Sequence, residues 1–259
     1  MNKNKKNDRL LEKAIHSFSN IAQSTDNPAE LAGRFANDLG VEKIIWSDIE
    51  YKLQLNGIKN FLDIGCGCGA LTEYSFNSAR INKYHIKLID FPDVIKKLKE
   101  TYINKLEKNI ELYDGYFPYN IPKGISTDRY DRILVYSVVH YTDQPKLFIE
   151  KTVELLKHRG IALFADLPNN NSKGRFIASD FGRQFEANYK NEKLSAVTNY
   201  KNHKEFVKNN IEQNSRINDQ LIIDLLTDYR EKGYNIYICP QPLTLPFCYT
   251  REDLIIQKP

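Results

Sequence analysis

The sequence predicts an α/β fold with a mostly parallel, doubly wound sheet between layers of helices. Short apolar runs typical of buried strands recur near residues 60–64, 85–90, 110–113, 131–137 and 161–166. Helix-like segments separate these runs, and such an alternation requires crossover connections between parallel strands. The first run breaks into Gly65, Gly67 and Gly69 before helix-like sequence from Leu71. This strand–turn–helix unit brings backbone N–H groups and a positive helix end to a ligand.

Helical segments flank the expected strands. Two of them, at 8–20 and 28–39, precede the sheet. The helix Asp93–Lys108 follows the second strand. The helix Gln144–His158 follows the fourth, and Gly160 just beyond it is typical of a helix end.

The pattern changes after Pro168. Residues 169–218 are rich in Lys, Asn and aromatic residues, with helical signals near 175–189 and 203–213. We interpret this segment as a helical lid inserted after the fifth strand; the alternative is a structural cover on the sheet with no ligand contact.

An amphipathic helix is expected at 219–232, followed by terminal strands at 234–239 and 251–257. A proline-containing loop joins these strands, so we expect an antiparallel hairpin that completes the sheet. The predicted organisation has four parts: an N-terminal helical region at 1–45, a cofactor-binding Rossmann-like core at 46–168, the lid at 169–218, and the C-terminal helix and hairpin at 219–259.

Composition and charge narrow the function classes. With 41% hydrophobic and 27% charged residues, the 259-residue chain has the composition of a globular protein. No apolar run approaches the roughly 20 residues of a membrane span, and no apolar signal core follows the charged N-terminus. The net charge of +4 is concentrated in the first ten residues, so the body offers no electrostatic surface for nucleic acid. We therefore expect a cytoplasmic protein with neither a membrane nor a nucleic-acid partner.

The cysteines and carboxylates do not form a metal-binding pattern. Cys66 and Cys68 lie inside the glycine turn, and the other two cysteines, Cys239 and Cys248, are about 170 residues away. Zinc ligands are normally more closely spaced, and small residues fit a tight turn. We expect no metal.

Two kinds of ligand fit the glycine turn. The pattern from Gly65 to Ala70 matches the dinucleotide fingerprint of NAD and FAD enzymes. However, Asp63 stands two positions before the first glycine, where its charge would repel a pyrophosphate and attract a cationic amino group. S-adenosylmethionine carries such a group and no phosphate, so Asp63 favours the methyl donor. A nicotinamide-dependent oxidoreductase remains open if Asp63 points away from the ligand.

The next two strands also end in acids. Asp90 follows the second apolar run, where a carboxylate can accept hydrogen bonds from both ribose hydroxyls of either kind of cofactor. Asp114, followed by Gly115, ends the third; an ordinary turn is the alternative interpretation there.

These motifs resemble class I S-adenosylmethionine-dependent methyltransferases. The resemblance rests on residues 62–69, on Ile89–Phe91, on Asp114 with Gly115 and on Tyr136–His140, and it covers about residues 40–168 well. It implies that the methionine part, the ribose and the adenine are bound by Asp63, Gly65, Cys66, Gly67, Asp90, Phe91, Asp114, Gly115, Tyr116 and Ser137.

The acceptor is less clearly encoded. The segment Tyr136–His140 lacks the Pro-Pro-aromatic motif of amino-methylating DNA enzymes, so we expect transfer to an oxygen of a small hydroxylated metabolite such as a sugar. His140, after the fourth strand, is the candidate general base, and a structural role at a helix entry is the alternative. His203 is a weaker candidate, and Asp166 could position a hydroxyl. A catalytically silent partner subunit of the same fold and a homodimer also remain open.

Overall fold

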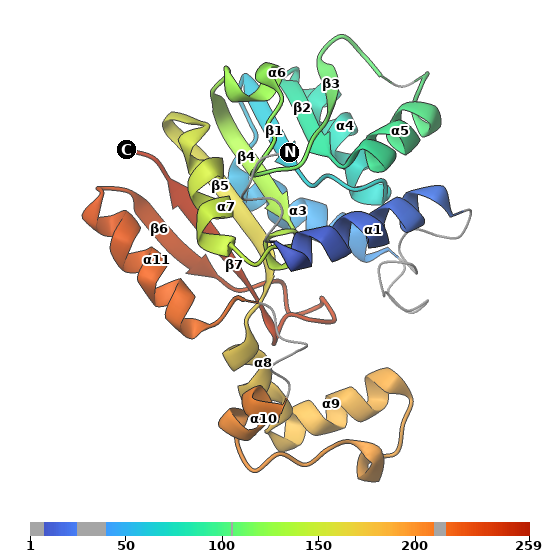
Figure 1. Cartoon of the computed structure of the whole chain (residues 1–259), viewed down its shortest axis with the longest axis vertical. Coiled ribbons are helices and arrows are strands. Elements are labelled where there is room, and N and C mark those ends of the chain that lie inside the picture. Colours follow the sequence, from blue (N-terminus) through green and yellow to red (C-terminus); the bar gives the residue numbers. More distant parts are fainter. Residues whose placement is uncertain (1–7, 25–39, 105, 210–215) are drawn as a thin grey trace.

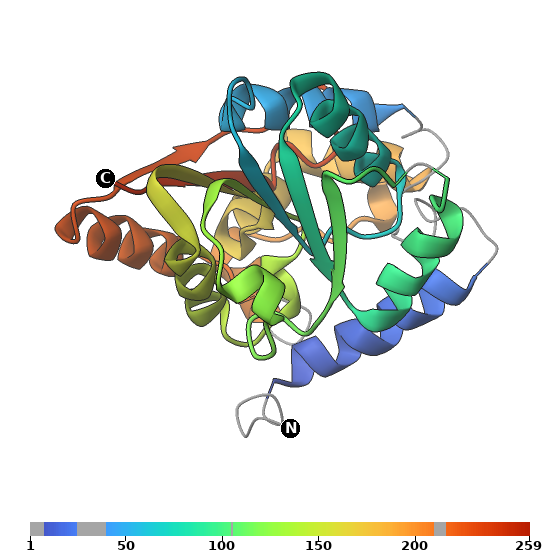
Figure 2. The ribbon, with the colours of Figure 1, turned by 90° about the horizontal axis from the view of Figure 1, so that it is seen from above.

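A seven-stranded sheet forms the centre of the protein in the computed structural model, which describes residues 8–24, 40–104, 106–209 and 216–259. Its strand order is β3-β2-β1-β4-β5-β7-β6, and helices lie on both sides (Figures 1 and 2). The α/β prediction is thereby confirmed. The strands are β1 (Asn60–Ile64), β2 (His85–Asp90), β3 (Ile110–Asp114), β4 (Tyr130–Tyr136), β5 (Leu156–Pro168), β6 (Asn235–Cys239) and β7 (Arg251–Gln257).

The first five strands are parallel, and β7 is antiparallel to both β5 and β6. This confirms the expected C-terminal hairpin. Because β2 and β4 lie on either side of β1, the chain reverses its winding direction between β1 and β4. In open α/β sheets a crevice forms at such a point, outside the carboxyl ends of the strands.

Two apolar cores cover the two faces of the sheet. One packs the sheet against the helices α3 (Val41–Leu53), α4 (Ala70–Asn82) and α5 (Pro92–Thr101). The other packs it against α6 (Lys123–Ser126), α7 (Pro145–Glu154) and α11 (Asp219–Glu231). The central strands are buried on both faces, which explains their nearly continuous apolar sequences.

The N-terminal helix α1 (Arg9–Gln23) crosses the carboxyl ends of the strands, packed against α5 (Figure 1). The helix expected at 28–39 lies outside the described residues. Helix α3 crosses the boundary expected between residues 45 and 46.

Beyond β5 the chain forms a small helical layer that projects from the body, as Figure 1 shows. It consists of α8 (Asn170–Ile177), α9 (Asp180–Lys190), the short 3-10 helix η4 (Leu194–Ala196) and α10 (His203–Asn209). The sequence predicted one helix over 175–189, but two occur, because the Ser179 hydroxyl accepts a hydrogen bond from the Gly182 N–H (3.0 Å) and starts α9 there.

Two further boundaries were predicted wrongly. Helix α5 ends at Thr101, not at Lys108. The helix expected to reach His158 ends at Glu154, and the chain enters β5 at Leu156, which pairs with Tyr130. Gly160 is therefore not a helix cap. It lies at an irregularity of β5, where a Cβ would come within 2.9 Å of the Tyr130 carbonyl.

Candidate active site

A cavity of about 630 Å³ opens at the carboxyl ends of β1, β4 and β5, where the winding direction reverses. Helix α1 contributes one wall with Leu11, Ala14, Phe18 and Ile21. Of the site residues predicted from the sequence, the cavity is lined by Gly65, Cys66, Gly67, Asp90, Phe91, Ser137 and His140.

The glycine turn follows β1 and forms the floor of the cavity. Gly65 and Gly67 have positive φ angles of 75° and 65°, which favour glycine. A Cβ on Gly65 would lie 2.4 Å from Val138 Cγ2, so the segment after β4 leaves no room for a side chain. The Gly65 N–H donates to the Ile89 carbonyl (2.8 Å), which fixes the turn against the end of β2.

Asp90 ties the glycine turn to β2. One carboxylate oxygen accepts the Gly67 N–H and the other the Phe91 N–H, both at 2.7 Å. Each oxygen keeps a free lone pair for a ligand hydroxyl. Burial raises the pKa of Asp90 to about 6, and the two N–H donors oppose that rise.

Asp63 lies beneath the turn, 5% exposed, and does not line the cavity. Burial, together with the nearby charge of Asp90, raises the pKa of Asp63 to about 8. In the ligand-free protein Asp63 therefore holds its proton below about pH 8, and a cationic ligand above the turn would favour its charged form.

The adenine end expected from the sequence is only partly formed. Phe91 lines the cavity, with ring-centroid distances of 6.4 Å to Phe18 of α1 and 5.9 Å to Tyr116. The described cavity lining does not include Asp114, Gly115 or Tyr116, and the Asp114 side chain is exposed. Their cofactor roles stay predictions.

Two strained residues lie side by side at the far end of the cavity. Ser137 after β4 and Asp166 in β5 have positive φ angles of 59° and 58°, an unfavourable conformation for residues with a Cβ. The Ser137 N–H donates to the Ala165 carbonyl (3.0 Å), so the two turns are coupled. Both residues line the cavity.

His140 belongs to the 3-10 helix η3 (Val139–Tyr141) after β4. Its ring lies against Tyr141, with a centroid distance of 4.1 Å, and its Nδ1 atom is shielded from solvent without a hydrogen-bond partner among the described residues. Burial, and secondarily the Arg251 guanidinium, lowers the pKa of His140 to about 3. This makes the imidazole a weak base, so its predicted role as general base stays a prediction that the local electrostatics do not support.

The sequence analysis missed a group of C-terminal residues that complete this end of the cavity: Gln241, Leu245, Phe247 and Arg251. Arg251 begins β7 and lies over the Phe247 ring, with its guanidinium carbon 5.5 Å from the ring centroid. Its Nη1 atom is 3.8 Å from the Asp166 carboxylate and 3.4 Å from the Asp166 carbonyl. Only the antiparallel pairing of β5 with β7 brings these distant segments together.

A buried ion pair supports Asp166 from below. The Asp253 carboxylate accepts the Asp166 N–H (2.9 Å) and the Gln241 amide (3.3 Å) with one oxygen, and Lys52 of α3 donates to its other oxygen (2.7 Å). Gln241 also donates to the Asp166 side chain (3.3 Å). This network holds Asp166 in its strained conformation.

The N-terminal helix is anchored beside the cavity by the fully buried Asp8. Its carboxylate caps α1 by accepting the Leu11 N–H (3.0 Å) and also accepts the Tyr119 hydroxyl (2.9 Å) and the Asp143 N–H (2.9 Å). The Thr142 hydroxyl donates to it as well. The sequence placed no function at Asp8, and the cluster explains how α1 stays over the cavity.

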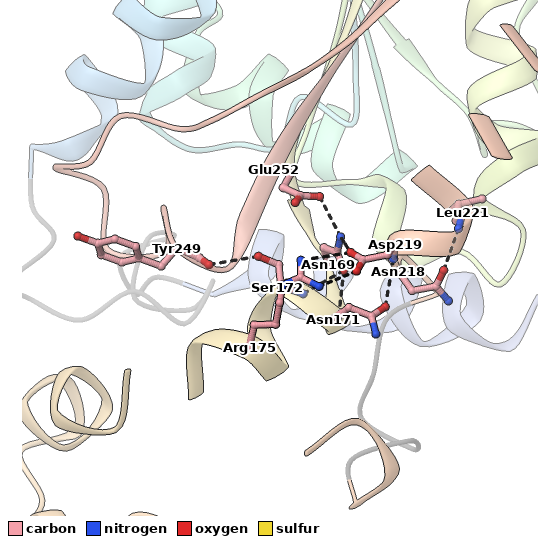
Figure 3. A network of polar contacts seen from close by, with 9 residues as sticks. All are labelled: Asn169, Asn171, Ser172, Arg175, Asn218, Asp219, Leu221, Tyr249 and Glu252. Carbon is pink, nitrogen blue, oxygen red and sulfur yellow. Dashed lines mark hydrogen bonds and ion pairs between the residues drawn. The ribbon is translucent and has the colours of Figure 1, made fainter. Parts of the chain in front are cut away.

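Figure 3 shows the polar cluster at the base of the helical layer that follows β5, whose predicted role as a lid stays a prediction. The buried Asn169 amide donates to Asp219 (2.8 Å) at the start of α11 and to Glu252 (2.9 Å) on β7, while its oxygen accepts the Asn171 N–H (2.9 Å). Arg175 pairs with Asp219 at 2.6 Å. The cluster joins both ends of this helical layer to the strand that carries Arg251. His203, the weaker candidate for the general base, lies on α10 and is not among the described residues that line the cavity.

No helix of the described residues is both long and apolar enough to cross a membrane. The same residues contain no group of three or more histidines, cysteines or carboxylates arranged to hold a metal ion.

Comparisons with known proteins find similarity to methyltransferases. Residues 62–162 match the family described as a methyltransferase domain. Malonyl-[acyl-carrier protein] O-methyltransferase of Haemophilus ducreyi is 32% identical over 120 residues, 43% of this chain and 43% of that protein. The matched segment therefore spans less than half the length of that curated relative.

Two solved structures share the fold. The methyltransferase domain of bacterial CtHen1-C superposes with a TM-score of 0.56 and 14% identity, over 85% of this chain and 99% of that one. The plantazolicin methyltransferase BpumL, solved with S-adenosylhomocysteine, gives a TM-score of 0.55 and 15% identity, over 96% of this chain and 100% of that one. Residues 62–162 thus resemble a methyltransferase domain, and the chain shares the fold of these two solved methyltransferases.

Proposed function

We propose that the protein transfers a methyl group from S-adenosylmethionine to an oxygen of a small molecule. The observation that carries the proposal is the pairing of the glycine turn with two carboxyl groups, Asp63 and Asp90. A pyrophosphate at this turn would disfavour the charged forms of both carboxyl groups. The cationic amino group and sulfonium of S-adenosylmethionine would favour those charged forms, so Asp63, which is protonated near neutral pH without ligand, would ionise when the cofactor binds.

The residues of the cavity fit this cofactor in a definite order. The glycine turn receives the methionine part, and the two free lone pairs of Asp90 accept the ribose hydroxyls. Phe91 flanks the adenine. When bound, the cofactor supplies an activated methyl group, so the protein has mainly to orient the acceptor and exclude water. Helix α1 serves the second purpose, because its apolar face walls the cavity.

An oxygen acceptor is supported by the O-methyltransferase named among the relatives. A small acceptor is supported by the volume, since about 630 Å³ must hold the cofactor and the acceptor together. The far end, with Ser137, His140 and Asp166, lies beyond the glycine turn and is the place for the acceptor. The hydroxylated metabolite expected from the sequence is one member of this class.

Calorimetric titration with S-adenosylhomocysteine, with NAD(H) and NADP(H) as parallel controls, tests the proposal. We expect binding of S-adenosylhomocysteine alone, followed by turnover of radiolabelled methyl groups onto an acceptor panel. Binding of a nicotinamide in its place would refute the proposal. Binding of S-adenosylhomocysteine without turnover on any acceptor would favour a catalytically silent partner subunit.

A further inference from the structure

We propose that the acceptor atom is a carboxylate oxygen, held by Arg251 and His140 at the far end of the cavity, and that the product is a methyl ester. This inference rests on the proposed function and adds the chemical class of the acceptor. Three features of the cavity support it: the unused edge of the Arg251 guanidinium, the unpartnered nitrogen of His140, and the fixed position of Asp166.

Arg251 presents a free edge to the cavity. Its side chain is 22% exposed, and Nη1 alone approaches Asp166, at distances of 3.4 and 3.8 Å. Among the described residues, Nη1 is the nitrogen of Arg251 that donates a side-chain hydrogen bond, and neither Nε nor Nη2 donates one. These two nitrogens form the side edge of the guanidinium, whose parallel donors match the two oxygens of a carboxylate. The Phe247 ring contacts the guanidinium and helps to hold it in place.

His140 supplies a second polar contact. The His140 side chain lines the cavity, and its shielded Nδ1 atom has no partner among the described residues. A buried polar atom without a partner is unfavourable, so a ligand that turns the ring and satisfies this atom binds more tightly. A carboxylate oxygen accepts a hydrogen bond from the imidazole N–H in one of its two tautomers.

Asp166 orients Arg251 and does not compete for the free edge. Its backbone is fixed by Asp253, and its side chain accepts from Gln241 (3.3 Å). It faces Nη1, whereas the proposed ligand faces Nε and Nη2. The single positive charge of the arginine would thus be shared between two carboxylates.

The chemistry of a carboxylate also removes the need for a base. A lone pair on its oxygen attacks the methyl carbon, the C–O bond forms as the C–S bond breaks, and the electron pair of that bond returns to sulfur. The products are a neutral ester and S-adenosylhomocysteine, and no proton is released. A hydroxyl acceptor would release one proton for each methyl group. The low pKa of His140 fits a carboxylate acceptor, because that reaction releases no proton and needs no strong base.

The test uses matched acceptors that differ only in the reacting group: phenylacetate, phenylacetamide and 2-phenylethanol, with hexanoate and monoethyl malonate as further carboxylates. Product is detected from the radiolabelled methyl donor, and protons are followed with an indicator dye in weak buffer. We expect methylation of carboxylates only, without proton release. The ring resonances of His140, observed by NMR in the complex with S-adenosylhomocysteine, should shift on adding phenylacetate and not on adding phenylacetamide.

Variants assign the contact. Arg251→Met should raise the KM for a carboxylate by about 10- to 100-fold, the range for a lost charged hydrogen bond, and leave S-adenosylhomocysteine affinity within about twofold. Arg251→Lys keeps the charge and should recover part of the loss. Arg129→Met, on an exposed arginine outside the cavity, is the matched control and should behave as wild type.

Several results would overturn the inference. They are methylation of 2-phenylethanol with proton release, unchanged carboxylate kinetics in Arg251→Met, and the joint absence of carboxylate methylation and of any His140 shift. If the wild-type protein did not bind S-adenosylhomocysteine, the proposed function would be refuted instead. Failure of the proposed function and failure of the carboxylate inference are therefore distinguishable.

Discussion

Replacing Asp63 by asparagine should change how the stability of the ligand-free protein depends on pH. Burial and the Asp90 charge raise the pKa of Asp63 from 3.8 to about 8. Between these two values the folded protein carries a proton on Asp63 that the unfolded chain has lost. The free energy of unfolding therefore falls as pH rises through this window, because the native state binds more protons than the unfolded state.

One proton of difference corresponds to about 1.4 kcal/mol for each pH unit. Asp63 should therefore lower the free energy of unfolding by about 3 kcal/mol between about pH 5 and pH 7. Asparagine has the same shape and does not titrate, so Asp63→Asn should lack this component of the slope. The raised pKa of Asp90, to about 6, adds a further decline in both proteins and cancels in the comparison.

Urea unfolding followed by the fluorescence of Trp46 provides the assay. Trp46 is the only tryptophan in the chain and is buried in the core beneath the sheet, so its signal reports global unfolding. The control is Asp131→Asn. The backbone N–H groups of Asn60 and Lys59 and the Lys157 side chain lower the pKa of Asp131. Above about pH 5 Asp131 is therefore charged in both the folded and the unfolded protein, and its contribution to the free energy of unfolding is constant. The Asp131→Asn variant should keep the wild-type slope. Equal slopes for wild type and Asp63→Asn would refute the reasoning.

Three further predictions concern the site and its supports. Asp90→Asn should weaken S-adenosylhomocysteine binding by about 10- to 100-fold in calorimetry, because the amide nitrogen would face the Gly67 or Phe91 N–H and the charge would be lost. Gly65→Ala should abolish binding and lower the melting temperature, since its Cβ would overlap Val138 at a positive φ; normal binding would contradict the crowding. Asn169→Ala should speed proteolytic cleavage within residues 169–218 and cost about 1–3 kcal/mol in urea unfolding, whereas wild-type cleavage rates would show that the cluster does not hold the lid.

The proximity of the glycine turn and Asp90 at the cavity could be predicted because their sequence signals are local. The glycine turn occupies a few consecutive residues, and Asp90 is recognisable as the acid at the end of an apolar run. Parallel pairing of β1 with β2 then brings them together, with the Asp90 carboxylate on the Gly67 N–H at 2.7 Å. Asp114 met the same sequence criterion and yet is exposed outside the cavity lining, because a strand end fixes the edge of the sheet but not the direction of a side chain.

The acceptor half could not be predicted for a physical reason. Arg251 reaches Asp166 across 85 residues of sequence, and only the antiparallel β5–β7 pairing sets that contact. The end of helix α7 was predicted wrongly for a related reason. The segment after Glu154 has a helix-like sequence, but the pairing of Leu156 with Tyr130 places it in the sheet. Tertiary pairing overrides local propensity in both cases.

The strained backbones of Ser137 and Asp166 connect these observations. A positive φ at a residue with a Cβ costs of order 1 kcal/mol or more, and it persists only where surrounding contacts determine it. At Asp166 those contacts are the Asp253 carboxylate and, through it, Lys52, so the antiparallel strand that carries Arg251 also fixes the residue that orients Arg251. The end of the cavity proposed for the cofactor is built from parallel strands, and the end proposed for the acceptor includes the added antiparallel strand. We therefore expect substitutions in β7 to change acceptor selection while cofactor affinity is retained.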